Sequence, residues 1–291
     1  MPAAVWDQIH TPLLYALPVF VVFMAIEVLV VRHAARDDLR GYDARDARTS
    51  IGMGAGSLVF MALLKAASLV VFVFLWTYVA PWHVPADTWW SWLLLIVVVD
   101  LAWYATHRFS HRVRFAWAGH QAHHSSEYFN LSTAVRQKWN PWVEGLFWLP
   151  LPLLGFTPWM IYIAFSANLV YQFFIHTETV DKLPRAVELV MNTPSHHRVH
   201  HGSDPEYLDK NYGGILIVWD RLFGTFAEER QRPRYGLTTP VDTHNVFRLQ
   251  YGEYAKMIAD VRAARGLRAK LGHVFGPPGW RPTDTPAVRQ G

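Results

Sequence analysis

Long apolar runs separated by short polar loops dominate the first 175 residues of the chain. Runs at 13–31, 57–80 and 89–105 are close to the roughly 20 residues that a transmembrane helix needs. A fourth run, 142–175, is longer than one crossing requires. Glu27 lies near the end of the first run, where its carboxylate is expected to reach the lipid headgroups. The pattern predicts three spanning helices followed by a membrane segment of unusual length.

The loops between these runs predict how the chain is oriented in the membrane. The loop at 32–48 carries five arginines, and Lys and Arg are concentrated in cytoplasmic loops. The loop at 81–88 has neither residue, as expected on the outer face. The N-terminus is therefore predicted to lie outside. Because no short apolar stretch with a cleavage site precedes the first run, that run is expected to remain as an anchor.

Histidines are concentrated in two short windows. Nine of the fifteen lie in THRFSHRVRFAWAGHQAHH at 106–124 and in HHRVHH at 196–201. The spaced sets are His107 and His111 (i, i+4), then His120, His123 and His124 (i, i+3, i+4), and finally His197, His200 and His201 with the same spacing. On a helix, each set projects its imidazoles from one face.

These three histidine faces predict a transition-metal site. Imidazole suits iron, zinc, copper and nickel, so the faces together would form a cage for one or two ions. A single histidine is more often an ordinary core or surface residue, but three sets with matching spacing favour the metal interpretation. The number of ligands favours a pair of ions, because a tetrahedral zinc site uses only four.

The run at 142–175 has two possible structures because GFTP at 155–158 is a turn signal at its middle. It forms either a membrane hairpin or one tilted helix that crosses once. A single crossing would separate 107–124 from 196–201 by a hydrocarbon core about 30 Å thick. The hairpin is therefore predicted, giving about four transmembrane helices, including or in addition to the hairpin. The protein would be integral to the membrane, the inner one in a bacterium, with every histidine set on the cytoplasmic side.

Two further residues are candidates for the same site. Asp100 lies in the third run, seven residues before His107 and on about the same helical face. It is either a catalytic residue that orients a ligating imidazole or a snorkelling or helix-pairing carboxylate, and both interpretations stay open. His176 directly follows the hairpin in IHTE and is expected as a further ligand, with an ordinary interfacial histidine as the alternative.

The remaining sequence predicts a helical cap within one domain, 1–291. Pro194 can start the helix that carries the second cluster, with Thr193 or Ser195 as its cap. The tail at 228–291 is basic, and its stretch at 245–271 has apolar and Lys/Arg positions on separate helical faces. That stretch is predicted to be an interfacial helix on anionic lipid or a helix packed on the domain with a solvated face.

Composition agrees with a membrane protein and excludes several kinds of site. Hydrophobic residues make up 52% of the chain and charged residues 17%, whereas soluble domains have about 25% charged residues. The chain has no cysteine, which excludes disulfides, thiolate-bound haem or iron–sulfur clusters and cysteine nucleophiles. Electrons for a redox reaction must then come from a partner or a small reductant. The net charge of +4 lies in loops beside apolar runs, so no nucleic-acid partner is expected.

The motifs HRFSH, GHQAHH and NTPSHHRVHH form the three-box pattern of the fatty acid hydroxylase and sterol desaturase superfamily, which this chain resembles from about residue 92 to 226. Longer segments, AGHQAHHSSEYFNLSTAVRQ, YQFFIHTE and NTPSHHRVHHGSDPEYLDKNYGGILIVWDRLFGTF, are similar to the alkylglycerol monooxygenases in particular. The resemblance implies an all-α membrane enzyme with a cytosolic helical cap. It also implies a histidine-held non-haem di-iron centre that uses O₂ to oxidise a C–H bond of a membrane lipid.

The resemblance also implies residue roles. The ligand boxes match His107, His111, His120, His123, His124, His197, His200 and His201. His176 and His196 match flanking histidines that are further candidate ligands. Glu127, in HHSSE, matches an acidic residue associated with tetrahydrobiopterin use and is thus a candidate for catalysis and cofactor binding, with a capping or surface carboxylate as the alternative. The implied reaction hydroxylates the alkyl carbon next to a glyceryl ether oxygen.

Other functions are weighed beside this one. A sterol or fatty-acyl hydroxylase or desaturase of the same superfamily, fed by a ferredoxin-type donor, is the nearest alternative. A metal transporter would use Asp100, Lys65 and the histidine-rich loops, but transport sites lie near the bilayer midplane. A metalloprotease is disfavoured because the sequence has no HExxH motif.

Overall fold

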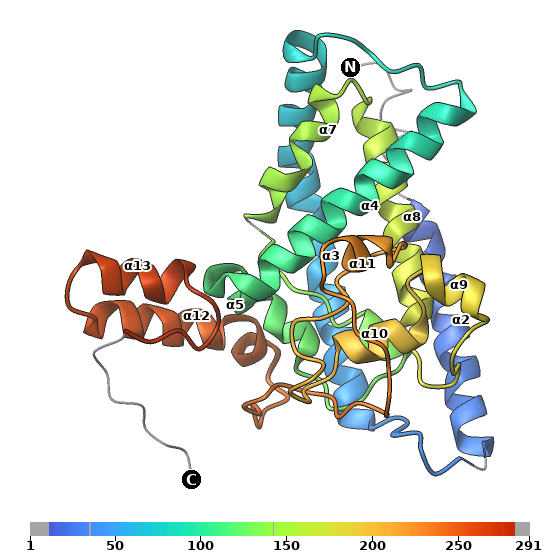
Figure 1. Ribbon diagram of the computed structural model, residues 1–291, viewed down its shortest axis with the longest axis vertical. Helices are drawn as coiled ribbons and strands as arrows, with labels where there is room; N and C mark the ends of the chain where they lie inside the picture. The colour runs from blue at the N-terminus through green and yellow to red at the C-terminus, as the bar shows by residue number, and fades with distance from the viewer. Residues whose placement is uncertain (1–11, 35, 142, 283–291) are drawn as a thin grey trace.

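A computed structural model describes residues 12–34, 36–141 and 143–282 of the chain (Figure 1). These residues are all-helical and contain no strand, only two isolated bridges. Four of their helices are long and apolar enough to cross a membrane. They are α2 (Pro12–His33), α3 (Ala44–Phe74) with the π-helical turn η1 (Leu75–Val79), α4 (Trp89–Arg112) and α8 (Pro158–Ile175). The predicted all-α membrane fold with about four spans is confirmed.

Helix α3 begins well before the apolar run that predicted it. The Asp43 side chain caps its first turn by accepting hydrogen bonds from two backbone N–H groups, at 2.8 and 2.9 Å. The polar first turns are buried against the rest of the protein, so Asp46 and Ser50 are at most 5% exposed. Hydropathy detects only the apolar part of such a helix, because residues buried in protein need not be apolar when they are hydrogen-bonded.

The run at 142–175 folds as the predicted hairpin, with unequal arms. The first arm consists of the 3₁₀ helix η2 (Glu144–Trp148) and the short helix α7 (Pro150–Leu153), and the second arm is α8. Prolines keep the first arm short because they lack the N–H that a longer helix needs. Gly155 turns the chain with φ +88°, and a Cβ there would lie 2.6 Å from the carbonyl oxygen of Trp82. The alternative prediction, a single tilted helix, is therefore wrong. Of the two arms, only α8 is long enough to span the membrane.

The hairpin brings both histidine-rich segments to the same end of the molecule. Figure 1 shows α5 (Arg114–His124) and α10 (Pro194–His200) on the side of the spanning helices that is opposite α7. Helix α10 starts at Pro194 as predicted, but Thr193 at its N-cap makes no side-chain capping bond. The short helices α9 (Arg185–Val190) and α11 (Val218–Leu222) come before and after α10 in the chain.

Glu27 lies inside the protein rather than at the headgroups, so that prediction is wrong. The side chain is 4% exposed and accepts hydrogen bonds from the backbone N–H of Leu131 (2.8 Å) and from the hydroxyls of Tyr42 and Thr177. It ties α2 to the start of the short helix α6 (Leu131–Ala134). Because two of its partners lie more than a hundred residues away in the sequence, these hydrogen bonds could not be predicted from the residues around Glu27.

The C-terminal stretch at 245–271 forms two helices instead of the predicted one. Helix α12 (Val246–Ala263) and helix α13 (Leu267–Phe275) are joined by a turn at Gly266, whose φ of +80° suits glycine. Figure 1 shows the pair projecting sideways from the body, beside α5.

Candidate metal centre

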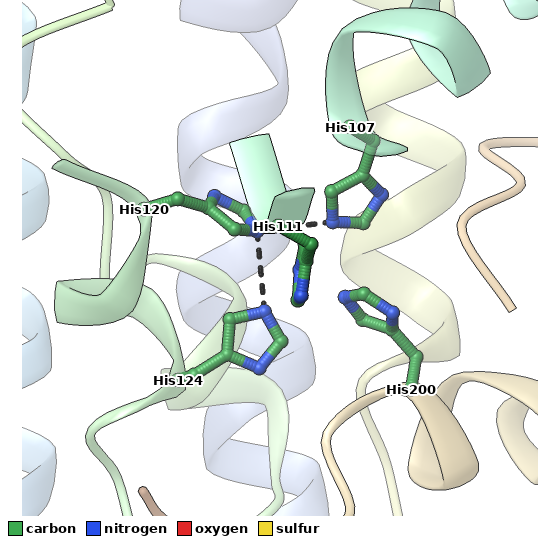
Figure 2. A group of neighbouring side chains, drawn as sticks. All are labelled: His107, His111, His120, His124 and His200. Atoms are coloured by element: carbon green, nitrogen blue, oxygen red, sulfur yellow. Dashed lines mark hydrogen bonds between the residues drawn. The ribbon is translucent and has the colours of Figure 1, made fainter. Parts of the chain in front are cut away.

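Nine of the ten candidate histidine ligands come together in two groups. The first group is His107, His111, His120, His124 and His200, and the second is His123, His176, His197 and His201. Within each group, one nitrogen per ring lies within 4.8 Å of the corresponding nitrogen of every other ring. Figure 2 shows the five rings of the first group, which come from α4, α5 and α10, converging on a common space. Eight of the nine rings are at most 7% exposed.

The two motifs with i, i+3, i+4 spacing, at 120–124 and 197–201, each contribute histidines to both groups. Members one turn apart (His120 with His124, and His197 with His201) share a group, whereas His123 and His200 belong to the opposite one. Adjacent residues point about 100° apart on a helix, so His123 and His124 face different centres. The groups adjoin, since the rings of His124 and His201 stack with centroids 4.3 Å apart.

Backbone carbonyls fix the tautomer of four rings. These are His107, His123, His176 and His200, whose Nδ1 atoms lie 2.9, 3.1, 2.6 and 3.0 Å from the carbonyl oxygens of Tyr212, Arg136, Gln172 and Lys210. A carbonyl oxygen can only accept, so each Nδ1 carries the hydrogen and donates it. Each Nε2 is then left with a free lone pair directed into its group, which is the form that binds a metal.

In two of these four rings, His123 and His200, no hydrogen satisfies the Nε2 lone pair. The Nε2 atoms of His123 and His176 lie 3.3 Å apart, yet both rings carry their hydrogen on Nδ1. Buried nitrogens of His111, His197, His200 and His201 have no hydrogen-bond partner among the described residues. An unsatisfied buried polar atom costs about 1–3 kcal/mol. A cation within each group would satisfy the ring nitrogens that point into it, so this donor set fits a metal.

Burial also keeps the imidazoles neutral. It lowers the pKa of His176 to about 3 and that of His200 to about 4, although a hydrogen bond to a backbone carbonyl opposes the shift in each case. Burial likewise holds the pKa of His120, His123 and His197 well below the usual value. Because only neutral imidazole binds a metal, these rings are ready to bind at neutral pH without losing a proton.

Arg136 positions the end of α5, although no sequence motif indicated this role. It is 2% exposed, and its guanidinium donates to the carbonyl of Ala122, the hydroxyl of Ser125 and the carboxylate of Asp46, each at 3.1 Å. Its own carbonyl accepts the Nδ1 hydrogen of His123. Arg136 therefore connects α3, α5 and one imidazole of the second group.

Arg198 positions helix α10 through a similar set of buried hydrogen bonds. It is fully buried, and its Nε and Nη2 atoms each donate to Glu229 at 2.7 Å. Its Nη1 donates to the carbonyls of Thr177 (3.1 Å) and Val180 (2.6 Å), in the loop that follows His176. The Arg198–Glu229 pair thus joins α10, which bears His197, His200 and His201, to the segment that bears His176.

Asp100 lies in the interior but does not contact an imidazole, in contrast to its predicted orienting role. Its carboxylate accepts hydrogen bonds from the backbone N–H of Ile215 (2.6 Å) and Leu216 (3.0 Å), from Trp219 Nε1 (2.9 Å) and from Asn168 Nδ2 (2.8 Å). The bond to Asn168 pairs α4 with α8, as the helix-pairing alternative expects. The others hold the loop that carries Tyr212, whose carbonyl binds His107, so its effect on the ligand is indirect.

His196 and Glu127 lie outside both groups. His196 Nε2 lies 3.0 Å from a carboxylate oxygen of Glu188 and Nδ1 lies 3.3 Å from the hydroxyl of Thr193, so both ring nitrogens are directed away from the other three histidines of its segment. We therefore leave it out of the ligand set. Glu127 is exposed at the end of α5, with Oε2 3.5 Å from an Arg40 nitrogen, and contacts no grouped histidine.

Comparison with known proteins agrees with this geometry. Residues 92–225, which include all nine grouped histidines, match the fatty acid hydroxylase family. An alkylglycerol monooxygenase of Danio rerio is 42% identical over 238 residues, covering 80% of this chain and 52% of that protein. The Homo sapiens alkylglycerol monooxygenase is 39% identical over 269 residues, covering 92% and 59%.

A more distant relative is the ornithine lipid hydroxylase OlsE of Rhizobium tropici, which is 29% identical over 139 residues, covering 46% of this chain and 41% of that protein. The chain spans about half the length of the alkylglycerol monooxygenases that it matches. No solved structure matches it. Through residues 92–225, the chain belongs to the fatty acid hydroxylase family.

Proposed function

We propose that this protein is a membrane-bound lipid monooxygenase whose nine grouped histidines hold two iron ions, one in each group. The observation that carries the proposal is the buried pair of Nε2 atoms of His123 and His176, which face each other without a hydrogen between them. Nine ligands exceed the four of a tetrahedral zinc site, and imidazole suits iron. Membership in the fatty acid hydroxylase family and similarity to proteins named monooxygenases support iron and O₂ chemistry.

Iron bound in this centre would supply the activation of O₂ that attack on a C–H bond requires. In the net reaction, one oxygen atom enters the C–H bond and the other leaves as water, with two electrons and two protons from a reductant. We propose an alkylglycerol as the substrate, following the names of the relatives. Hydroxylation next to the ether oxygen gives a hemiacetal, which breaks into a fatty aldehyde and glycerol.

The depth of the centre supports this position of attack. His107 and His111 lie in the last two turns of α4, and His176 directly follows α8. The centre is thus at the end of the spanning helices, where a lipid presents its headgroup and the first carbons of its chain. Oxidation beside the headgroup suits this depth better than oxidation deep in an acyl chain. The same depth argues against a metal transporter, whose site lies near the midplane.

We place the centre on the cytoplasmic side of the membrane. The backbone N–H of Arg40 donates to Glu178 at 2.8 Å, two residues after His176. The arginine-rich loop at 32–48 therefore lies at the same end of the molecule as the centre. Short loops rich in Lys and Arg are cytoplasmic by the positive-inside rule.

The proposed reaction predicts a defined product. Purified protein in lipid nanodiscs, given O₂, an alkylglycerol and a reduced pterin or ferredoxin system, should release a fatty aldehyde. Labelled oxygen from O₂ should appear in that aldehyde when it is trapped at once and analysed by mass spectrometry. Hydroxylated or desaturated sterol or fatty-acyl products would instead support the alternative substrates. Iron-loaded protein that oxidises none of these lipids would contradict the proposal.

We further propose that Glu127 binds a pterin reductant. Its side chain is 56% exposed and lies three residues after His124, at the end of α5. A carboxylate can accept two parallel hydrogen bonds from the amino and ring N–H groups of a pterin, as it does from a guanidinium. An exposed carboxylate beside a ligand-bearing helix would hold the reductant close to the centre without being a ligand itself.

Replacing Glu127 with Gln tests this role. The variant keeps the size of the side chain but loses one acceptor and the charge, so the KM for tetrahydrobiopterin should rise about tenfold, which corresponds to ~1.4 kcal/mol. Iron content should not change. Glu206→Gln, which removes another exposed carboxylate, is the matched control. An unchanged KM in the Glu127 variant would show that this carboxylate does not bind the pterin and is only a surface residue.

A further inference from the structure

The α12–α13 hairpin supplies no residue to either histidine group, yet its surface is unusual. Figure 1 shows both helices running across the direction of α2 and α3. A helix that crosses the direction of the spanning helices lies along the membrane plane. The inference drawn from this hairpin does not depend on the proposed enzymatic function.

Both helices of the hairpin expose large apolar residues. On α13, Leu267, Leu271 and Phe275 follow one another at i, i+4 and i+8 and are 71%, 45% and 62% exposed. Residues at this spacing lie on one helical face. On α12, Phe247 and Tyr251 have the same spacing and are 63% and 38% exposed. Exposed apolar rows of this kind mark an interaction surface.

The hairpin is also strongly basic. Between residues 245 and 276 there are six Lys or Arg and two acidic residues. Both acidic residues, Glu253 and Asp260, already pair with Arg114, at 3.0 and 2.6 Å. The remaining cations around the apolar row are Arg262, Arg265, Arg268 and Lys270, and none of them forms an ion pair with another described residue. Their charge is therefore available to an anionic partner.

Two contacts fix the hairpin at the level where the spanning helices end. The carbonyl of Gly276, directly after α13, accepts a hydrogen bond from the backbone N–H of Arg114 (2.9 Å), two residues beyond the end of α4. At the other end, the Phe247 ring meets Trp139 edge-on with centroids 5.5 Å apart. Trp139 in turn stacks on Phe60 of α3, with centroids 5.3 Å apart.

This second contact sets the exposed Phe247 of α12 beside the apolar surface of a spanning helix. Beside Phe60, α3 exposes Val59 (62%) and Leu63 (65%), in the apolar part of the helix that is expected to face lipid. Phe247, set beside that surface, meets the same lipid at its headgroups. An amphipathic helix with Lys and Arg beside its apolar row binds anionic lipid in this position.

We propose that the α12–α13 hairpin docks on the anionic phospholipids of the leaflet that contains the metal centre. Leu267, Leu271 and Phe275 enter the boundary between headgroups and acyl chains, and the four unpaired cations bind the phosphate groups. Because α12 packs on α5 through Leu249 and Ala122, the docked hairpin also holds the ligand-bearing α5 at the membrane surface.

Spin labelling tests this docking directly. The chain has no cysteine, so a single introduced cysteine carries the label. Leu271→Cys reports on the hairpin, Val70→Cys on the lipid-facing part of α3, and Glu206→Cys on an exposed polar surface. In nanodiscs containing phosphatidylglycerol, the label at position 271 should resemble that at 70, with high collision rates for O₂ and low rates for a water-soluble nickel chelate. The readout does not depend on activity.

The other outcomes overturn the proposal. A label at 271 that collides with nickel as often as the label at 206 would put the hairpin in water. A label shielded from both reagents would indicate that protein, such as a second copy of the chain, covers it.

A charge variant tests the choice of anionic lipid. Replacing Arg262, Arg265, Arg268 and Lys270 together with Gln should raise nickel access at position 271 several-fold in nanodiscs with phosphatidylglycerol. The expected access is then close to that of the parent label in nanodiscs of phosphatidylcholine alone. The control replaces Arg185 and Arg230, exposed basic residues outside the hairpin, and should have no effect. Equal changes in both variants, or none in either, would contradict an anionic site on the hairpin.

Discussion

Replacing His197 with Ala should remove iron and abolish lipid oxidation, whereas replacing the adjacent His196 with Gln should leave both intact. His197 belongs to the second group, where its Nε2 lies 3.0 Å from that of His176 and its Nδ1 has no partner. His196 is equally buried but pairs with Glu188. Loss of groups that merely orient a ligand costs about 10–100-fold in metal affinity or activity, so the loss of a ligand should cost more than that.

The measurement compares iron per chain and aldehyde formation in the two variants, purified in parallel. Size-exclusion profiles establish that both remain folded. Because the two residues are neighbours on the same short helix, a general disturbance of α10 would affect both variants alike. Equal losses in the two variants, or full iron content in the His197 variant, would contradict the proposed ligand set.

Replacing Arg198 with Met should destabilise the protein more than any surface change. Glu229 is 7% exposed and would lose the two 2.7 Å bonds that now satisfy it, with only the longer contact to Arg232 (3.6 Å) left. Breaking a buried pair by removing one partner costs about 3–5 kcal/mol. The same substitution also leaves the carbonyls of Thr177 and Val180 without their donor.

Thermal unfolding in detergent measures this effect. The double variant Arg198→Met with Glu229→Leu should recover much of the loss, because it removes the uncompensated charge. Arg185→Met, at an exposed arginine of α9, is the control and should change stability by no more than ~0.5 kcal/mol. A single Arg198 variant as stable as this control would show that the buried pair does not hold α10 in place.

The sequence predicted the spanning helices well where apolar residues face lipid, and less well where polar residues are buried in protein. It placed the start of α3 at residue 57, because Asp46 and Ser50 look like loop residues until Arg136 is seen beside them. It identified Asp100 as significant, but most of its partners, at positions 215–219, lie more than a hundred residues away. Such long-range hydrogen bonds leave no local pattern.

The histidine sites were largely predictable, but their division was not. Spacing indicated which residues share a helical face, and the position of His176 directly after the hairpin suggested it as a further ligand; its ring lies in the second group. It did not separate His123 from His124, because that depends on how α5 and α10 are set against each other. His196 was included because it matches a flanking histidine of the family pattern, and its pairing with Glu188 depends on α9 packing beside α10.

The proposed function depends most on two metal ions in the two histidine groups, so metal content is its most direct test. Protein purified from iron-supplied cells and washed with a weak chelator should be analysed for iron and zinc by mass spectrometry. The two groups predict about two iron ions per chain and negligible zinc. A chain that retains no metal, a single ion, or zinc in place of iron would contradict it.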